Sequence, residues 1–228
     1  MRKLSIAAAL AICTLGISSS AHAQRGGGLG IQSPAVTGIF HPAVGSGADY
    51  EWTKDDGTKN EFELSLVGKE SVNGADGYWM EVTMQTPQMG DVTSKMLIVP
   101  TSQTTTIAKM VIQIPGRGAM SMPMNMMQGR GAAPPPEDIR NRASMVGSES
   151  VTVPAGTFTC DHWHMNDNSG DAWIATSVAP YGLVKMVSTK DKTTMVLVKT
   201  LTNVQDKITG PVMDMSQMMR GMGAPPQQ

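Results

Sequence analysis

The sequence predicts an all-β protein with almost no helix, built as a single curved antiparallel sheet or half-open barrel of about nine or ten strands. Three observations lead to this fold class. Apolar and polar residues alternate along several short runs, turn-forming dipeptides separate the runs, and apolar residues at helical spacing are almost absent. Because the connections between the runs are mostly short, neighbouring strands are expected to pair antiparallel.

Length and charge narrow the class further. A chain of 228 residues is expected to form one domain with appendages. Its 18 Lys and Arg residues against 19 Asp and Glu residues give a formal net charge of -1, which excludes the basic field that a general nucleic-acid binder needs. Charged residues make up only 16% of the chain, so it is not a charge-rich disordered protein either.

Residues 1–23 are predicted to be a secretory signal peptide. Two basic residues follow the initiator methionine, residues 4–17 are mostly apolar, and Ala21-His22-Ala23 has the small-x-small pattern of a cleavage site. Cleavage is expected between Ala23 and Gln24. The apolar stretch is short for a membrane span, and no later stretch reaches the length of one. We therefore expect a periplasmic or secreted protein that is not an integral membrane protein.

The remaining chain divides by composition into a β domain and flexible flanks. Residues 24–48 are rich in glycine and have no pattern, so they are expected to be a flexible lead-in. The half-barrel domain is placed at residues 49–208, and residues 116–136, rich in Gly, Pro and Met, are expected to be a flexible insertion outside its sheet. Residues 209–228 have a similar composition and are expected to be a disordered tail.

Alternation places the strands in order along the domain. Phe62, Leu64 and Leu66 alternate with polar residues, and a second alternating run starts at Tyr78. Asn73-Gly74 and Asp76-Gly77 lie between the two runs and favour a hairpin turn. A short helix is expected after the prolines at 134–136. Further strands are expected near residues 93–99, 105–114, 148–153, 157–165, 172–176, 183–188 and 194–201.

The C-terminal half contains a motif of strand, turn and strand, Val153-Pro154-Ala155-Gly156-Thr157-Phe158-Thr159-Cys160. Pro154 sets the backbone for a turn position and Gly156 supplies a permissive one. Farther along, Gly182 is expected to allow a bend after Pro180. These residues therefore have a structural role in shaping hairpins.

This motif, followed by Trp173-Ile174 and by Pro180-Tyr181-Gly182-Leu183-Val184-Lys185, resembles an exported bacterial family of unknown function with a VPAGTF turn. The resemblance covers roughly residues 147–204. Members of that family look similar to the curved-sheet proteins typified by periplasmic lipoprotein carriers. The resemblance implies a half-barrel with an apolar concave face and, by analogy, a role in binding.

A row of candidate metal ligands follows the motif. If residues 157–165 form a strand, Cys160, His162 and His164 lie on one face, with alternate side chains about 7 Å apart. Thiolate and imidazole groups suit copper or zinc. The alternative is an ordinary packed strand with Cys160 buried and the two histidines near the wet rim, since the spacing is long for a single ion.

Methionines form the second candidate site. Met120, Met122 and Met124 make a Met-x-Met pattern, and a second group of methionines lies near the C-terminus. Thioether sulfur is a soft, neutral ligand that favours Cu(I). Two alternatives stay open: a low-complexity segment, or an adaptable apolar lining for varied ligands.

Patterns of catalysis are mostly absent. The chain has no G-x-S-x-G, H-E-x-x-H or C-x-x-C motif and no phosphate-binding glycine loop, so it is expected not to be an enzyme. Asp167-Asn168-Ser169-Gly170-Asp171 is interpreted as a polar hairpin turn and not as a calcium loop. The predicted function is binding of an apolar ligand or an envelope partner on the curved sheet. The alternative is periplasmic copper binding or buffering through the Met-rich segments and the Cys/His strand, and the oligomeric state is left open.

Overall fold

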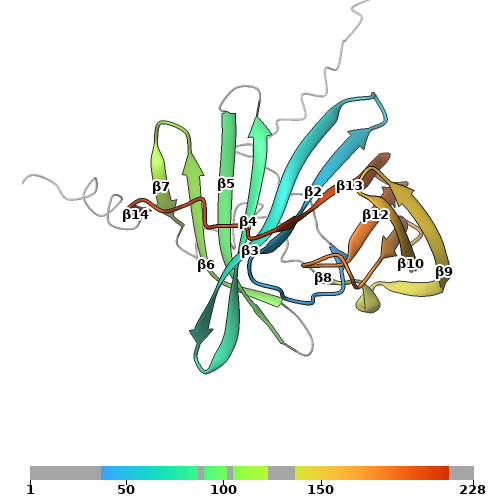
Figure 1. Ribbon diagram of the computed structural model, residues 1–228, viewed down its shortest axis with the longest axis horizontal. Coiled ribbons are helices and arrows are strands. Elements are labelled where there is room, and N and C mark those ends of the chain that lie inside the picture. The colour runs from blue at the N-terminus through green and yellow to red at the C-terminus, as the bar shows by residue number, and fades with distance from the viewer. Residues whose placement is uncertain (1–36, 87–89, 102–104, 123–136, 216–228) are drawn as a thin grey trace, which may run out of the picture.

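Twelve strands pair edge to edge in one strongly curved sheet that does not close into a barrel (Figure 1). The computed structural model describes residues 37–86, 90–101, 105–122 and 137–215. The strand order is β14-β7-β6-β5-β4-β3-β2-β13-β12-β11-β10-β9, and β1 and β8 form a separate parallel pair. The predicted all-β class and curved sheet are confirmed, whereas nine or ten strands was slightly low.

The chain builds this sheet in two antiparallel series that meet at β2 and β13. From β2 to β7 each strand pairs with the next, and β9 to β13 do the same from the opposite edge. The bounds are β1 (Thr37–Gly38), β2 (Ser46–Lys54), β3 (Lys59–Val72), β4 (Ala75–Thr86), β5 (Gly90–Pro100), β6 (Thr105–Ile114), β7 (Gly118–Ser121), β8 (Glu137–Asp138), η1 (Ile139–Asn141), β9 (Ala143–Val153), β10 (Gly156–Met165), β11 (Gly170–Ile174), β12 (Leu183–Ser188), β13 (Thr193–Thr202) and β14 (Val212–Asp214).

The predicted hairpin between β3 and β4 turns at the first of its two candidate dipeptides. Val72 lies opposite Ala75, so Asn73 and Gly74 are the two loop residues. Both have positive φ, 51° and 84°, which is the backbone that Asn-Gly hairpins favour. The dipeptide Asp76-Gly77 is already part of β4.

Residues expected to be flexible contribute short elements to the fold. Within the expected insertion, residues 118–121 form β7, which pairs with β6, while residues 123–136 lie outside the described residues. The helix expected after the prolines is one 3-10 turn, Ile139–Asn141. In the expected tail, residues 212–214 form β14, which runs parallel to β7. The expected signal peptide, with Ala23 and Gln24, also lies outside the described residues.

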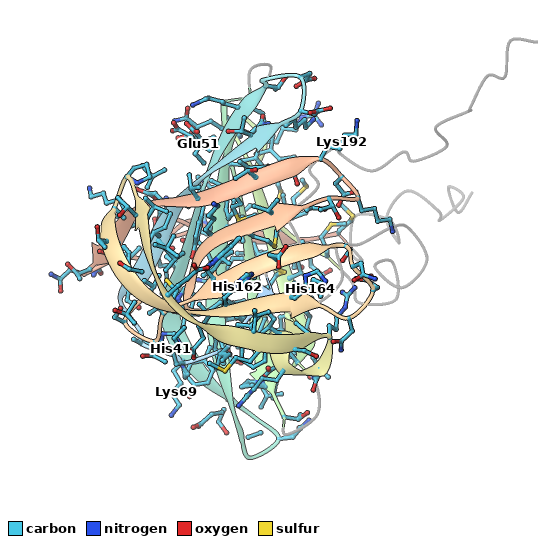
Figure 2. All side chains as sticks on the ribbon, turned by 90° about the vertical axis from the view of Figure 1, so that its right-hand side faces the viewer. His41, Glu51, Lys69, His162, His164 and Lys192 are labelled. Atoms are coloured by element: carbon cyan, nitrogen blue, oxygen red, sulfur yellow. The ribbon has the colours of Figure 1, made fainter. Side chains whose placement is uncertain are left out.

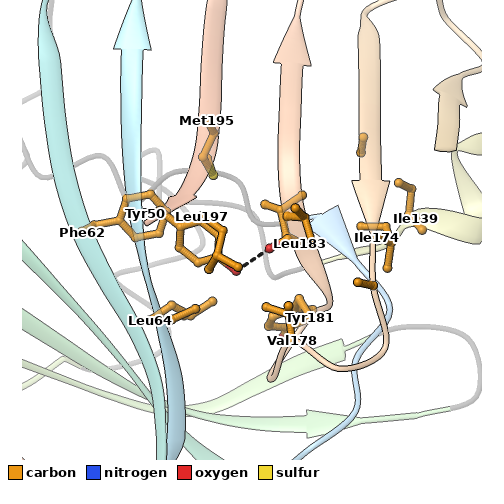
Figure 3. Close-up of a cluster of buried hydrophobic side chains, with 14 of the residues drawn as sticks. Tyr50, Phe62, Leu64, Ile139, Ile174, Val178, Tyr181, Leu183, Met195 and Leu197 are labelled. Carbon is orange, nitrogen blue, oxygen red and sulfur yellow. Dashed lines mark hydrogen bonds between the residues drawn. The ribbon is translucent and has the colours of Figure 1, made fainter. Parts of the chain in front are cut away.

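The concave face of the sheet carries the main apolar core (Figure 3). Tyr50 stacks on Phe62 with ring centroids 5.1 Å apart, and its hydroxyl donates a hydrogen bond of 3.1 Å to the Leu183 carbonyl. Leu64 and Leu197 lie beside them, both fully buried. This cluster joins the two series of strands at β2 and β13, so apolar burial holds the sheet together at its centre.

Segments outside the large sheet cover this apolar face. Phe40 packs its ring against Tyr78 and Tyr181 at centroid distances of 5.6 and 5.1 Å. The Ile39 amide donates to the Tyr181 carbonyl over 3.0 Å, and Ile139 from η1 is fully buried in the same cluster. The concave face is therefore filled by the chain's own side chains.

The opposite, convex face is polar and is crossed by a strap, which we define as residues 203–214. Figure 1 shows this red segment passing from β13 across the strands to β14 at the far edge. The Val204 amide donates to the Gly45 carbonyl over 2.9 Å, and Ile208 is buried against Val111 and Ala119. The strap therefore covers convex-face side chains of β6 and β7.

The predicted bend at Gly182 gives a test of this packing. Gly182 has φ +71°, and an added Cβ would lie 2.7 Å from Ile174 Cγ2. We expect Gly182→Ala to lower the free energy of unfolding by about 2 kcal/mol or more, because left-handed backbone and close contact both oppose the methyl group. Gly147→Ala is the control, since a Cβ there meets nothing within 4 Å. Urea unfolding of both variants measures the difference, and equal stabilities would contradict this account of the bend.

Candidate functional site

The edge strand β9 is exposed along most of its length. Residues 144–150 are all exposed, and β9 is the last strand of the sheet, with β10 on one side only. Met145 and Val146 have 52% and 63% of their surface exposed. The ladder shifts register between His162 and Trp163, which leaves Val146 without an opposite residue and forms a β-bulge. The result is an edge that presents both main-chain groups and apolar side chains.

Side-chain hydrogen bonds hold β9 to its neighbours. Ser148 Oγ donates to Asp161 Oδ1 over 2.7 Å, and Thr152 Oγ1 lies 3.0 Å from Thr157 Oγ1. Near the start of the strand, Ser144 Oγ donates to the Asn166 side chain over 2.8 Å. At the other end, the hairpin tip is fixed because the Ala155 amide donates to the Leu197 carbonyl of β13. The edge is therefore pre-organised along its whole length.

A polar network lies beside this edge, on β10 and β11 (Figure 2). His162 stacks on Trp173 with ring centroids 4.6 Å apart, and Trp173 Nε1 donates to Glu149 Oε1 over 2.5 Å. Lys185 Nζ lies 4.7 Å from the Trp173 ring centroid. Glu149 of β9 is thus tied through Trp173 to the two strands behind it.

Asp171 connects the two histidines. Its Oδ1 lies 3.0 Å from His162 Nε2 and 2.9 Å from His164 Nδ1, while His164 Nε2 lies 3.0 Å from Asn168 Oδ1. The hydrogen bonds to Asn168 and then to Asp171 raise the pKa of His164. Burial opposes the ionisation of Asp171, yet its bonds to His164 and His162 hold the pKa of that carboxyl below its ordinary value.

The surroundings of Cys160 differ from those of the two histidines. It is fully buried in the main apolar cluster, and its Sγ lies 3.7 Å from the Phe158 carbonyl oxygen of its own strand. Burial, followed by the charges of Asp161 and Glu149, raises the pKa of the thiol to about 11. The thiol is therefore protonated at neutral pH, as expected for a cysteine buried in apolar surroundings.

The predicted methionine site is only partly within the described residues. Met120 and Met122 pack against the small apolar cluster of Val92, Ile112 and Ile114. Met124 lies outside the described residues. Met120 and Met122 thus contribute apolar surface to this cluster. Across the described residues, no group of three or more His, Cys, Asp or Glu is arranged to hold a metal ion.

The turn motif lies at the connection between β9 and β10. Val153 lies opposite Gly156, so Pro154 and Ala155 form the loop between β9 and β10. Gly156 and Gly182 have φ of 130° and 71°. Residues 167–169 form the polar turn between β10 and β11, with the Ser169 amide donating to Asp167 Oδ1 over 3.0 Å.

Sequence reasoning missed Glu149, Asp171, Trp173 and Lys185 as members of one site. They come from three strands, and each contributes a side chain that is unremarkable by itself. A register of β9 to β12 would have placed them together, because Trp173 lies opposite both His162 and Lys185.

Comparisons with known proteins do not assign this chain to a family. No protein-family profile and no curated protein matches the sequence. A Bacteroides fragilis protein described as exported, with a YmcC-like fold, aligns with TM-score 0.38 and 14% identity over 72% of this chain and 99% of its own. A Parabacteroides distasonis protein described as a lipoprotein aligns with TM-score 0.35 and 13% identity, over 74% of this chain and 100% of its own. MucB in complex with MucA(peri) aligns with TM-score 0.34 and 8% identity, over 73% of this chain and 53% of its own. At these TM-scores the likenesses carry no inference about function.

The described residues include no helix that is long and apolar enough to cross a membrane.

The histidine network predicts a pH-dependent contribution to stability. A raised histidine pKa stabilises the fold below the ordinary value of 6.5, and this contribution is lost as the pH rises through the raised value. The lowered pKa of Asp171 acts in the opposite range, because its contribution is lost only as the pH falls below 3.8. We expect His164→Gln and Asp171→Asn to lower stability more at pH 5.5 than at pH 9, measured by urea unfolding. Lys190→Gln, at an exposed position nearby, is the control. An equal loss at both pH values would contradict the network.

Proposed function

We propose that the protein is exported and binds a polypeptide partner of the cell envelope along the β9 edge, without catalysis. The observation that carries the proposal is the exposure of residues 144–150 on a strand that is pinned in place. An extended segment of the partner would add to the sheet as a further strand, with main-chain hydrogen bonds supplying affinity. Met145 and Val146 would give apolar contacts next to it.

The composition of β9 supports this use of the edge. Edge strands are commonly protected from unwanted pairing by lysine or proline. Residues 143–153 contain neither, and their single charged residue is Glu149. That carboxylate accepts a hydrogen bond from Trp173, so part of its hydrogen-bonding capacity is already used. A bulge next to such an edge re-aims a side chain outward, as it does for Val146.

The filled concave face favours a polypeptide partner over a small apolar ligand. A ligand bound there would have to displace Phe40, Tyr181 and Ile139, which pack against the sheet's own apolar residues. Each fully buried side chain of this kind contributes about 1.5–3 kcal/mol. At the outer edge of β9, by contrast, no other strand among the described residues would have to be displaced.

Export rests on the predicted signal peptide, residues 1–23. We expect the protein purified from its host to be found outside the cytoplasm and to begin at Gln24, as measured by cell fractionation and N-terminal mass spectrometry. A cytoplasmic protein that retains residues 1–23 would contradict this part of the proposal.

Photo-crosslinking tests whether a partner binds along the β9 edge. With a photoreactive residue at position 145, we expect a discrete crosslinked species in the native envelope. Val146→Lys should reduce its yield about fivefold or more, because an edge lysine opposes strand addition. Val44→Lys is the matched control, since Val44 is 52% exposed and lies outside β9.

Two outcomes would overturn the proposal. One is a crosslink yield that Val146→Lys and Val44→Lys reduce equally, which would separate crosslinking from the edge. The other is a lipid-like molecule that co-purifies with the protein in equal amount and is recovered by organic solvent, which would favour the apolar-ligand function on the concave face.

A further inference from the structure

The strap crosses the convex face over a buried carboxyl group, Glu81 of β4. Glu81 has 0% of its surface exposed. The Lys207 amide of the strap donates to both of its oxygens, over 3.2 and 3.3 Å. Glu81 also shares a hydrogen bond with Asp206 of the strap. Two carboxyl groups therefore meet where the strap touches the sheet.

Two carboxyl groups in hydrogen-bond contact are held together best when they share one proton, because two buried negative charges repel. The proton belongs to Glu81, since burial and the bond to Asp206 raise its pKa to about 7. Asp206 is paired with Lys95 of β5, and although burial opposes its ionisation, the bonds from Lys95 and Glu81 lower its pKa. In its protonated form Glu81 is therefore the donor and ionised Asp206 the acceptor of the bond between them.

The other charged groups nearby already have partners. Lys207 Nζ lies 2.5 Å from Glu63 Oε2 of β3 and donates to Thr83 Oγ1 over 3.2 Å. Lys95 Nζ, which pairs with Asp206, also lies 4.9 Å from the ring centroid of Trp79. Asp206 and Lys95 are therefore the charged side chains that interact with Glu81.

We propose that Glu81 and Asp206 form a pH-sensitive latch that holds the strap while Glu81 is protonated and loosens it when Glu81 ionises. Below neutral pH the shared proton bonds the strap to β4. Above neutral pH two carboxylates face each other, and their repulsion opposes the contacts that still hold the segment, which are those of Lys95, Lys207 and Val204.

Loosening would uncover two surfaces. Ile208 would leave Val111 and Ala119, which it buries on the convex face. Beyond it, β14 is only three residues long, is exposed throughout, and pairs with β7 in parallel. With so few ladder bonds, β14 depends on the rest of the strap to stay in place. Release would therefore expose an apolar patch and the edge of β7 together.

Hydrogen exchange tests the latch on the full chain. After correction for intrinsic rates, we expect protection of the Lys207 and Ile208 amides to fall about tenfold or more between pH 5.5 and pH 8.5, which corresponds to one pKa unit. Amides of the β3–β4 hairpin serve as the internal reference, and their protection should change much less.

Glu81→Gln should hold the strap at both pH values, because its amide still donates to Asp206 and accepts from Lys207 without ionising. Glu51→Gln, an acid on β2 that pairs with Lys59, should leave the pH dependence as in the wild type. If Glu81→Gln does not fold, the wild-type profile remains decisive. Strap protection that stays constant from pH 5.5 to 8.5, or that falls together with the hairpin, would overturn the latch, as would an unchanged pH dependence in folded Glu81→Gln.

Discussion

The rest of the structure depends on how the apolar concave face is covered. A curved twelve-stranded sheet that does not close into a barrel has one apolar face, and this face must be buried away from water. The chain meets this requirement with its own segments, because Phe40, Ile139 and Tyr181 pack into the hollow. The convex face and the edges of the sheet are consequently the places where the molecule can interact without losing its core.

Alternation is a local property, and it predicted the parts of the fold that local properties decide. Phe62, Leu64 and Leu66 form the concave side of β3, and Asn73-Gly74 makes its turn, as the sequence indicated. The strands β7 and β14 could not be found this way. They are three or four residues long, too short for a pattern, and each exists because a distant strand offers it hydrogen bonds.

The candidate site shows the same division between local and cross-strand information. Period two put Cys160, His162 and His164 in one row, but alternate residues of a strand lie about 7 Å apart, whereas residues opposite each other on neighbouring strands lie about 5 Å apart. The histidines therefore contact Asp171 and Trp173 of β11 instead of Cys160. The partners could be predicted only with the register of β10 against β11, which depends on the turn at residues 167–169.

The two ends of the strand order differ in how the last long strand is covered, and this difference bears on function. The β7 edge is capped by β14, but a three-residue parallel ladder is a weak cap, so its persistence depends on the strap contacts at Glu81 and Asp206. In the part of the chain that the structure describes, no strand pairs with the outer edge of β9, and side-chain bonds hold this strand to β10 and β11. An uncapped edge exposes the protein to aggregation unless it is short, charged, bulged, covered or used. Because β9 is eleven residues long and carries one charged residue, the bulge at Val146 is the protection that the described strand has, and the partner proposed above would pair with the rest of the edge.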